Sequence, residues 1–244
     1  MKLSYRLETV ASFVTRGNTV ADVGTDHGYI PIFLVEEGIA PSAIAMDLRK
    51  GPLERAREHV RERGLEGKIE TRLGDGLENL APGEADTVVI AGMGGELICR
   101  ILEGGRRLWD QVGEWVLSPQ SELSAVRLFL WENGFSLEDE AMVLEDGKYY
   151  TVMRCERRGR QGEEKPDPAQ LKYGPVLLKR KDPVLREFLA EERQKLEAIA
   201  DTLRESGTEK AAARFREVEA ELALAKEAYD EVQGSDTGSG GAGA

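Results

Sequence analysis

The 244-residue chain contains few of the residues that form metal sites or disulfide-linked folds. Its two cysteines, Cys99 and Cys155, lie far apart, and its two histidines, His27 and His59, do not complete a ligand set with them. This count excludes a structural zinc site, and we expect both cysteines to be reduced. No apolar run approaches the roughly 20 residues of a membrane span, and the first residues lack the apolar core of a secretory signal. These absences predict a cytoplasmic protein with no membrane segment and no bound metal.

Positive charge is scarce over the whole chain but concentrated in one segment. The 33 Lys and Arg residues face 45 Asp and Glu residues, and the resulting net charge of -12 argues at first against a nucleic-acid partner. Residues 157–181 reverse this balance, with eight basic residues against three acidic ones. Such a basic strip is either a solvated linker or a surface that binds phosphate, and its composition leaves both interpretations open.

Between residues 19 and 154 the hydrophobic pattern is typical of alternating strands and helices. Short β-branched runs predict strands at 20–24, 43–47, 69–73, 86–91 and 115–118, and amphipathic stretches predict helices at 31–37, 52–63, 96–102 and 121–133. Because strands that alternate with helices form parallel sheets, this order predicts an α/β fold. Two further runs, 135–144 and 149–156, flank a Glu-Asp-Gly-Lys turn and predict an antiparallel hairpin at the end of the sheet.

The pattern changes after residue 156. Glycines and prolines at 157–183 predict an irregular, basic linker, and the Gly/Ser-rich segment 233–244 predicts a flexible tail. Between them, at 184–232, apolar residues recur at spacings of three and four, which predicts an antiparallel coiled-coil hairpin with a break at 206–208. Its expected seam comprises Leu185, Leu189, Leu196, Ile199 and Leu203 in the first helix and Ala211, Phe215, Val218, Leu222, Ala225, Tyr229 and Val232 in the second.

The most informative motif, Asp22-Val-Gly-Thr-Asp-His-Gly28, follows the first predicted strand and precedes a helix. A glycine turn at that junction lets a ligand approach the backbone and the helix N-terminus. The glycine spacing does not fit the nicotinamide fingerprint, and the acidic strand end suits a cationic ligand such as S-adenosylmethionine. Asp47 ends the second strand, where a carboxylate can accept both ribose hydroxyls, and Asp75 follows the third, where one can accept the adenine amino group. Three acids at successive strand ends predict an S-adenosylmethionine site.

The fourth and fifth predicted strands end in glycines and an amide. The segment Ala91-Gly-Met-Gly-Gly95 stands where methyltransferases that act on amino nitrogens often have an Asn/Asp-Pro-Pro-aromatic tetrad. Its three glycines either leave room for a flat base beside the methyl donor or form a tight strand–helix turn, and both interpretations stay open. Gln120 places an amide side chain at the same edge of the sheet.

With these motifs in view, the chain resembles the bacterial tRNA (adenine-22-N1)-methyltransferases, which are class I methyltransferases with a C-terminal coiled-coil domain. The resemblance covers residues 1–232 and rests on L-S-x-R-L at 3–7, D-V-G-T-D-H-G-Y-I-P at 22–31, G-M-G-G at 92–95, E-D-G-K-Y-Y at 145–150 and Tyr173-Gly-Pro175. It implies a Rossmann-like methyltransferase domain at 1–156, S-adenosylmethionine as cofactor and tRNA as partner. The implied reaction transfers a methyl group to N1 of an adenine, at position 22 of the tRNA.

The resemblance also implies where the cofactor and the target base bind. The expected cofactor-binding residues are Asp22, Gly24, Thr25, Asp26, His27, Gly28, Asp47, Leu48, Asp75, Gly76, Ala91, Gly92 and Met93. The residues expected at the methyl group and the base are Asp26, His27, Tyr29, Gly92, Met93, Gly94 and Gln120. Asp26 is the first candidate to stabilise the cationic product base, while His27 either orients the base or only stabilises the turn.

A base-paired adenine cannot present N1, so the target must be unpaired or flipped into the pocket. This requires a grip on the tRNA, which we assign to the basic strip and one face of the helical hairpin, in a monomeric protein. The expected RNA-binding residues are Arg157, Arg158, Arg160, Lys172, Lys179, Arg180 and Lys181. Two alternatives remain: a methyltransferase for a small molecule or a protein with a dimerising hairpin, and a non-catalytic, cofactor-sensing RNA-binding protein.

Overall fold

A computed structural model describes residues 1–159, 164–206 and 208–234. It divides the chain into two compact units, Met1–Pro166 and Asp167–Ala244, ten residues later than the domain boundary predicted at 156. The expected RNA-binding residue Arg160, the centre of the predicted helix break at residue 207 and most of the predicted tail lie outside the described residues. Within the described ranges, no helix is long and apolar enough to cross a membrane.

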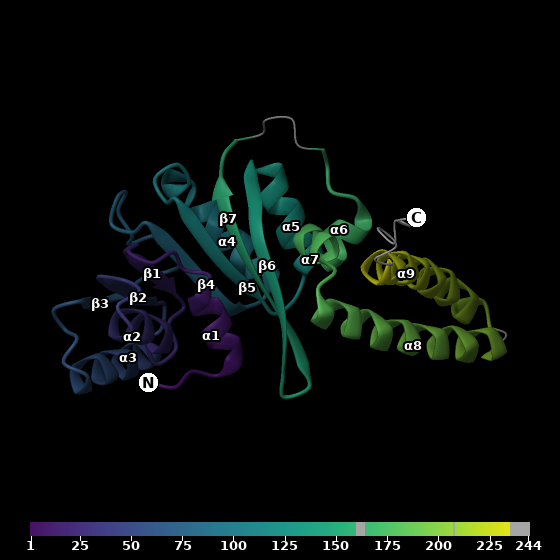
Figure 1. Ribbon diagram of the computed structural model, residues 1–244, viewed down its shortest axis with the longest axis horizontal. Coiled ribbons are helices and arrows are strands. Elements are labelled where there is room, and N and C mark those ends of the chain that lie inside the picture. Colours follow the sequence, from purple (N-terminus) through teal and green to yellow (C-terminus); the bar gives the residue numbers. More distant parts are fainter. Residues whose placement is uncertain (160–163, 207, 235–244) are drawn as a thin grey trace, which may run out of the picture. The chain divides into compact units, whose positions relative to one another are not determined.

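The first unit is built on one seven-stranded sheet with the order β3-β2-β1-β4-β5-β7-β6 (Figure 1). Its strands are β1 (Val20–Val23), β2 (Ala43–Asp47), β3 (Ile69–Leu73), β4 (Thr87–Met93), β5 (Glu114–Pro119), β6 (Phe135–Glu145) and β7 (Lys148–Arg157). The first five are parallel, whereas β7 runs antiparallel between β5 and β6. The predicted α/β fold with a closing antiparallel hairpin is confirmed.

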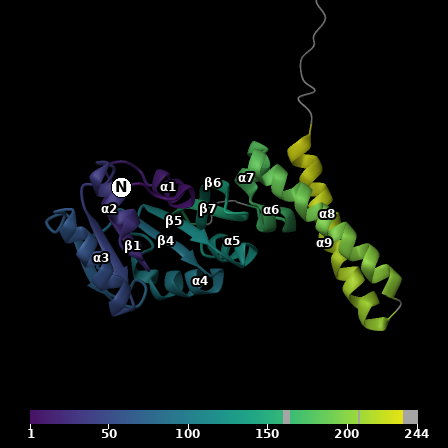
Figure 2. The same cartoon turned by 90° about the horizontal axis from the view of Figure 1, so that it is seen from below.

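Helices cover both faces of this sheet (Figure 2). They are α1 (Tyr5–Ser12), α2 (Tyr29–Glu36), α3 (Lys50–Glu62), α4 (Gly95–Gly104) and α5 (Leu123–Glu132), with a 3-10 turn at Arg106–Leu108. Apolar residues of α4 and α5 form one hydrophobic core with the sheet, and those of α1 and α2 form a second core on the opposite face. The hydrophobic pattern did not reveal α1, because this helix has only two turns and two buried residues, Val10 and Ala11.

Local sequence explains the hairpin that closes the sheet. Asp146 and Gly147 both have positive φ, 48° and 71°, as a two-residue type I′ turn requires. This turn fixes the pairing of Glu145 with Lys148 at the tip of β6 and β7. The hairpin thus positions the aromatic residues that begin β7 near the start of the chain, since α1 contacts both strands.

The second unit consists of four helices, α6 (Pro168–Tyr173), α7 (Pro175–Arg180), α8 (Pro183–Ser206) and α9 (Glu209–Gln233). The prediction of irregular structure throughout 157–183 is wrong for α6 and α7. Proline is favoured in the first helical turn, where no N–H partner is needed, and Pro168 and Pro175 both begin helices there. A capping box formed by Asp167 and Gln170 further stabilises the start of α6.

The helices α8 and α9 pack together as the predicted hairpin. The expected seam residues Val218, Ala225 and Val232 are buried in α9. In α8 the expectation for Ile199 is wrong, because its side chain is 44% exposed and Ala200 is buried instead. The seam of α8 therefore shifts by one residue at this level.

Candidate active site

A cleft of about 620 Å³ lies at the carboxyl ends of the parallel strands. Its lining comes from the segments that follow β1, β2, β3, β4 and β5, together with residues of α1, α2 and α4. In open α/β sheets, ligands bind at this edge, where the chain connections change direction across the sheet. Here that change falls between β1 and β4, which are neighbours in space. The cleft is therefore the candidate active site.

Asp22 supplies a buried carboxyl group to the cleft from strand β1. Only 5% of the residue is exposed. Burial raises the pKa of Asp22 to about 6; the Thr25 hydroxyl lowers it, and the nearby Asp47 carboxylate adds to the rise. A carboxylate that is costly to ionise in the free protein is well suited to a cationic ligand, because a bound positive charge stabilises its ionised form.

Asp47 and Asp26 contribute two further carboxylates that differ in environment. Asp47 is 6% exposed, and its Oδ1 accepts a hydrogen bond of 2.6 Å from the backbone N–H of Arg49, which holds the carboxylate at the end of β2. The Asp26 side chain is 69% exposed, and its Oδ1 lies 3.5 Å from Arg55 Nη2 and 3.5 Å from His27 Nε2. Asp47 is thus fixed and buried, whereas Asp26 is open to solvent and already shares its charge with a cation.

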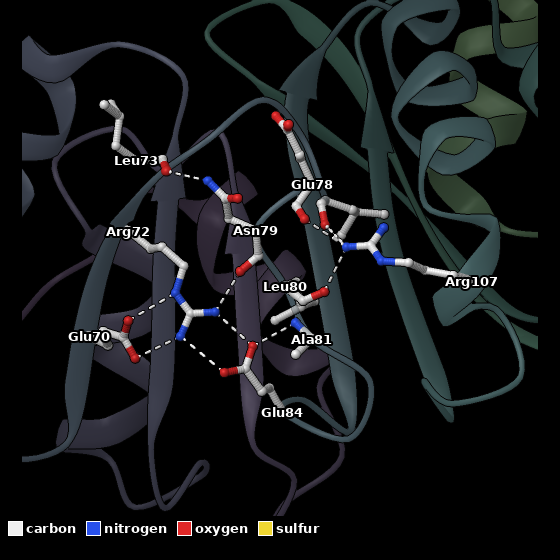
Figure 3. Close-up of polar contacts among 10 residues, drawn as sticks. Glu70, Arg72, Leu73, Glu78, Asn79, Leu80, Ala81, Glu84 and Arg107 are labelled. Carbon is white, nitrogen blue, oxygen red and sulfur yellow. Dashed lines mark hydrogen bonds and ion pairs between the residues drawn. The ribbon is translucent and has the colours of Figure 1, made fainter.

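The loop after β3, which brings Asp75 and Gly76 to the cleft, is held in place by Arg107 (Figure 3). One guanidinium nitrogen of Arg107, Nη2, donates hydrogen bonds of 2.7–2.8 Å to the backbone carbonyls of Leu77, Glu78 and Leu80. Leu77 and Leu80 are also buried in the core. Both ends of the loop segment are thereby anchored next to Asp75.

Arg72 holds the other side of the same loop (Figure 3). Its guanidinium pairs with Glu70 and Glu84 and donates to the carbonyl of Asn79 at 2.7 Å. The two carboxylates raise the pKa of Arg72, and the hydrogen bond from Arg72 lowers the pKa of Glu84, as expected of a stabilising network. Since Asn79 Nδ2 donates in turn to the carbonyl of Leu73, the network joins the end of β3 to the loop.

Two glycines, one in the cleft and one outside its lining, leave no room for a side chain. Gly24 has φ of 78°, and a Cβ atom there would lie 1.9 Å from Cε of Met93, so a side chain would displace this methionine. Gly95 does not line the cleft, and a Cβ atom there would meet the carbonyl oxygen of Ser121 at 2.5 Å. The tight-turn interpretation therefore accounts for Gly95, while Gly92, with φ of 79° and only the ends of Arg6 and Gln120 within 4 Å of a Cβ position, lines the cleft.

The structure gathers most of the predicted site residues in one place. The expected residues that line the cleft are Asp22, Gly24, Asp26, Tyr29, Asp47, Leu48, Asp75, Gly76, Ala91, Gly92, Met93 and Gln120. Thr25, His27, Gly28 and Gly94 are not among the lining residues. His27 has a backbone φ of 60°, and its ring stacks against those of Tyr29 and His59. The backbone carbonyl of His27 lies 2.8 Å from Nδ1 of His59. These contacts favour the turn-stabilising interpretation of His27.

Known proteins that resemble this chain agree with this geometry. Residues 3–153 match the family model of a methyltransferase domain. The chain is 35% identical over 233 residues to the tRNA (adenine(22)-N(1))-methyltransferase of Bacillus subtilis (strain 168), covering 94% of this chain and 98% of the relative. The chain belongs to this family.

Solved structures of the tRNA (adenine(22)-N(1))-methyltransferase family superimpose along nearly the whole chain. The crystal structure of the B. subtilis m1A22 tRNA methyltransferase matches with a TM-score of 0.83 and 36% identity, covering 94% of this chain and 99% of the other. Streptococcus pneumoniae Sp1610 in complex with S-adenosyl-L-methionine matches with a TM-score of 0.82 and 35% identity, covering 93% and 100%. The matches span both units of the chain, so the helical hairpin is part of the family fold.

Sequence reasoning missed several residues that line the cleft of this family member. They are Arg6, Leu7, Val23, Ile30, Arg49, Gly74, Leu97, Arg100 and Ile101. Arg6 lies in the L-S-x-R-L motif, which carried the resemblance without a role, so a signal existed for it. Leu97 and Ile101 are four residues apart on α4, and the helical periodicity of that segment could have placed them on one face.

The basic strip is divided between the two units. In the first unit, Arg157 pairs with Asp110, and Arg158 pairs with Glu138 at 3.2 Å and Glu156 at 2.9 Å. A phosphate group at this part of the strip would have to compete with carboxylates already in place.

In the second unit, Lys172 pairs with Glu192 at 3.1 Å, and Lys181 donates a hydrogen bond to the carbonyl of Gly234. Lys179 and Arg180 lie in the last turn of α7. Glu192 also accepts a hydrogen bond from the Tyr173 hydroxyl at 2.7 Å, which fixes the entry to the helical unit. The RNA-binding role of the strip stays a prediction.

Among the described residues, no group of three or more His, Cys, Asp or Glu side chains is arranged to hold a metal ion. Cys155 is buried, and burial raises the pKa of its thiol far above the usual range, while burial raises the pKa of Cys99 to about 11. Both thiols therefore stay protonated at neutral pH and are poor nucleophiles. Neither thiol is therefore a candidate nucleophile, and the acidic cleft remains the candidate active site.

Proposed function

We propose that this protein transfers a methyl group from S-adenosylmethionine to N1 of the adenine at position 22 of tRNA. The observation that carries the proposal is the cleft at the sheet edge, where Asp22, Asp47, Asp75 and Gly92 come together. The B. subtilis relative, with 35% identity over 94% of this chain, supports the substrate, and the S. pneumoniae structure in complex with S-adenosyl-L-methionine supports the cofactor.

The residues present fit the cofactor. A cleft of about 620 Å³ accommodates a nucleoside with an amino-acid side arm, and it has one buried acid and one backbone-anchored acid. In this proposal Asp47 accepts hydrogen bonds from the ribose hydroxyls, and Asp75, on the loop held by Arg107, accepts one from the adenine amino group. Asp22 offsets positive charge from within the cleft, where burial strengthens the interaction.

Bound S-adenosylmethionine supplies a methyl group on a positively charged sulfur. The lone pair of adenine N1 attacks the methyl carbon, the carbon–sulfur bond breaks, and S-adenosylhomocysteine leaves. Because N1 carries no proton, the protein needs no general base. Its residues instead orient the two reactants and exclude water. Gly92, Met93 and Gln120 line the cleft where the base is to enter, and Asp26 lies at the exposed side, where a carboxylate stabilises the cationic product base.

The adenine must leave its stack to reach the cleft, at a cost of a few kcal/mol. Contacts to phosphates elsewhere on the tRNA offset this cost. We assign these contacts to the basic strip at 157–181, whose exposed lysine Lys179 and neighbour Arg180 end α7, and to one face of the hairpin formed by α8 and α9.

The deciding experiment is incubation of the purified protein with unmodified tRNA and labelled S-adenosylmethionine, followed by nuclease digestion and nucleoside analysis. We expect label in 1-methyladenosine from a tRNA with adenine at position 22, and none from the same tRNA with guanine there. Label in small amines or proteins alone would favour a small-molecule or protein methyltransferase. Binding of the cofactor with no transfer would favour a non-catalytic sensor. Either result would overturn the proposal.

A further inference from the structure

Two motifs that the cofactor site leaves unexplained meet in the structure. The L-S-x-R-L motif contributes Arg6 from the first turn of α1, and the E-D-G-K-Y-Y motif contributes the tip of the β6–β7 hairpin. The guanidinium carbon of Arg6 lies 5.1 Å from the centre of the Tyr150 ring. The backbone N–H of Arg6 donates a hydrogen bond of 3.1 Å to the carboxylate of Glu145. These two contacts join segments that are more than 130 residues apart.

The contacts place the Arg6 side chain in the cleft. Arg6 is one of its lining residues. A Cβ atom built on Gly92 would lie 3.8 Å from Nη1 of Arg6 and 3.9 Å from Nε2 of Gln120, so both side chains lie directly beside this glycine. Gly92 follows the buried part of β4, next to the position assigned to the methyl group and the base. Arg6 thus stands on the substrate side of the cleft.

The positive charge of Arg6 does not favour the methyl transfer itself. The methyl donor and the methylated base are both cationic, and a guanidinium beside them raises their energy. Among the residues that the structure describes, no Asp or Glu side chain lies within ion-pair distance of the Arg6 guanidinium. An anion has to supply the missing partner: the methyl donor carries one carboxylate, and the RNA substrate carries one phosphate per nucleotide. The affinity for S-adenosylhomocysteine, which keeps that carboxylate, separates the two, and a loss of this affinity on substitution of Arg6 would overturn the phosphate assignment. Arginine binds phosphate well because its planar group donates two parallel hydrogen bonds.

We propose that Arg6 binds a backbone phosphate of the tRNA next to the target adenosine, and that Tyr150 is a positioning residue that holds the guanidinium over the cleft. This inference rests on the proposed function, whose substrate contact it specifies. The aromatic ring provides a flat surface on which the guanidinium lies, so that its edges remain available for the phosphate. Binding then brings the nucleotide and its phosphate to the cleft as one unit.

The test measures binding of unmodified tRNA to the whole protein at a series of salt concentrations, together with steady-state kinetics. A lysine or arginine that binds one phosphate contributes about one unit to the slope of log K against log salt concentration. For Arg6→Gln we expect that slope to fall by about one, and KM for tRNA to rise roughly tenfold. The affinity for S-adenosylhomocysteine should stay unchanged.

Two pairs of variants separate phosphate binding from a structural effect. Arg106→Gln is the matched control for charge, because Arg106 also lies over an aromatic ring, 4.9 Å from the centre of Trp109, but pairs with Glu103 away from the cleft. It should leave the salt slope and KM unchanged. Tyr150→Phe keeps the ring and should behave as the wild type, whereas Tyr150→Leu should raise KM for tRNA as Arg6→Gln does.

An unchanged salt slope in Arg6→Gln would overturn the proposal. A fall in kcat at saturating tRNA with an unchanged slope would also overturn it, because it would place Arg6 at the base instead of a phosphate. Failure of the proposed function is a separate result: the wild-type protein would then produce no 1-methyladenosine, whatever the variants bind.

Discussion

We expect the ionised Asp22 carboxylate to favour cofactor binding and to lower the stability of the folded protein. Its pKa rises from 3.8 to about 6, which corresponds to a cost of about 3 kcal/mol for the ionised carboxylate in the folded protein. Because the folded-state pKa lies above the unfolded one, the folded protein holds this proton more tightly. The contribution of Asp22 to the free energy of unfolding is therefore fully present below about pH 4 and is lost as the pH rises to 6.

The substitution Asp22→Asn removes the charge and keeps the shape. At pH 7.5 without cofactor, we expect this variant to unfold at a higher temperature than the wild type, by up to about 5–10 °C, and the difference to shrink toward pH 4. Thermal unfolding at several pH values measures it. Asp86→Asn is the matched control, because hydrogen bonds from Thr19 lower the pKa of Asp86. That substitution should destabilise the protein at pH 7.5 and have less effect at acidic pH.

The same substitution should weaken binding of the cationic cofactor. In the wild type, protonation of Asp22 below pH 6 should reduce cofactor affinity, by up to tenfold per pH unit, and Asp22→Asn should abolish this dependence. Titration calorimetry at pH 5 to 8 measures both proteins. A variant that is less stable than the wild type at pH 7.5, or that keeps the pH dependence of binding, would refute the assignment of a buried, cation-binding carboxylate.

Three further single substitutions test other contacts in the protein. Asp47→Ala should weaken cofactor binding about tenfold or more by removing charge-assisted hydrogen bonds, whereas Asp26→Asn should lower kcat more than cofactor affinity; equal effects on both parameters in both variants would contradict this division of roles. Arg127→Met should destabilise the protein by about 3–5 kcal/mol in chemical denaturation, because it removes the 2.9 Å ion pair with Glu140 in the core, and Arg127→Met with Glu140→Leu should recover much of that loss.

The parallel part of the sheet could be predicted from the sequence because β1, β2, β4 and β5 are short and largely buried, and helical segments separate the parallel strands. β2 and β3 begin and end where the pattern predicts, and the other strands differ by one or two residues. The prediction failed for helices whose formation depends on local capping residues and not on a hydrophobic repeat. The helix α6 has only six residues, so its capping box and Pro168 decide its formation, and no hydrophobic repeat could reveal it.

The site divides in the same way. The acids Asp22 and Asp47 could be predicted to meet in the cleft because adjacent parallel strands end at one edge of the sheet. Arg6 could not be placed, since its position depends on the packing of α1 against a hairpin more than 130 residues away. Nor could the pairing of Arg158 with Glu138, which depends on two strands meeting.

Two carboxylates of the cleft, Asp22 and Asp47, differ sharply in burial from the basic residue Arg49. Asp22 and Asp47 are 5% and 6% exposed, whereas the side chain of Arg49, also at the cleft, is 76% exposed. Buried charges act through a low dielectric and are little screened by salt, while exposed charges are screened within about 10 Å at 0.1 M salt. An acidic protein can thus bind a cationic cofactor inside the cleft and a polyanion at its rim. Raising the salt concentration should weaken tRNA binding far more than cofactor binding, and equal losses would place the acids and arginines in the same environment.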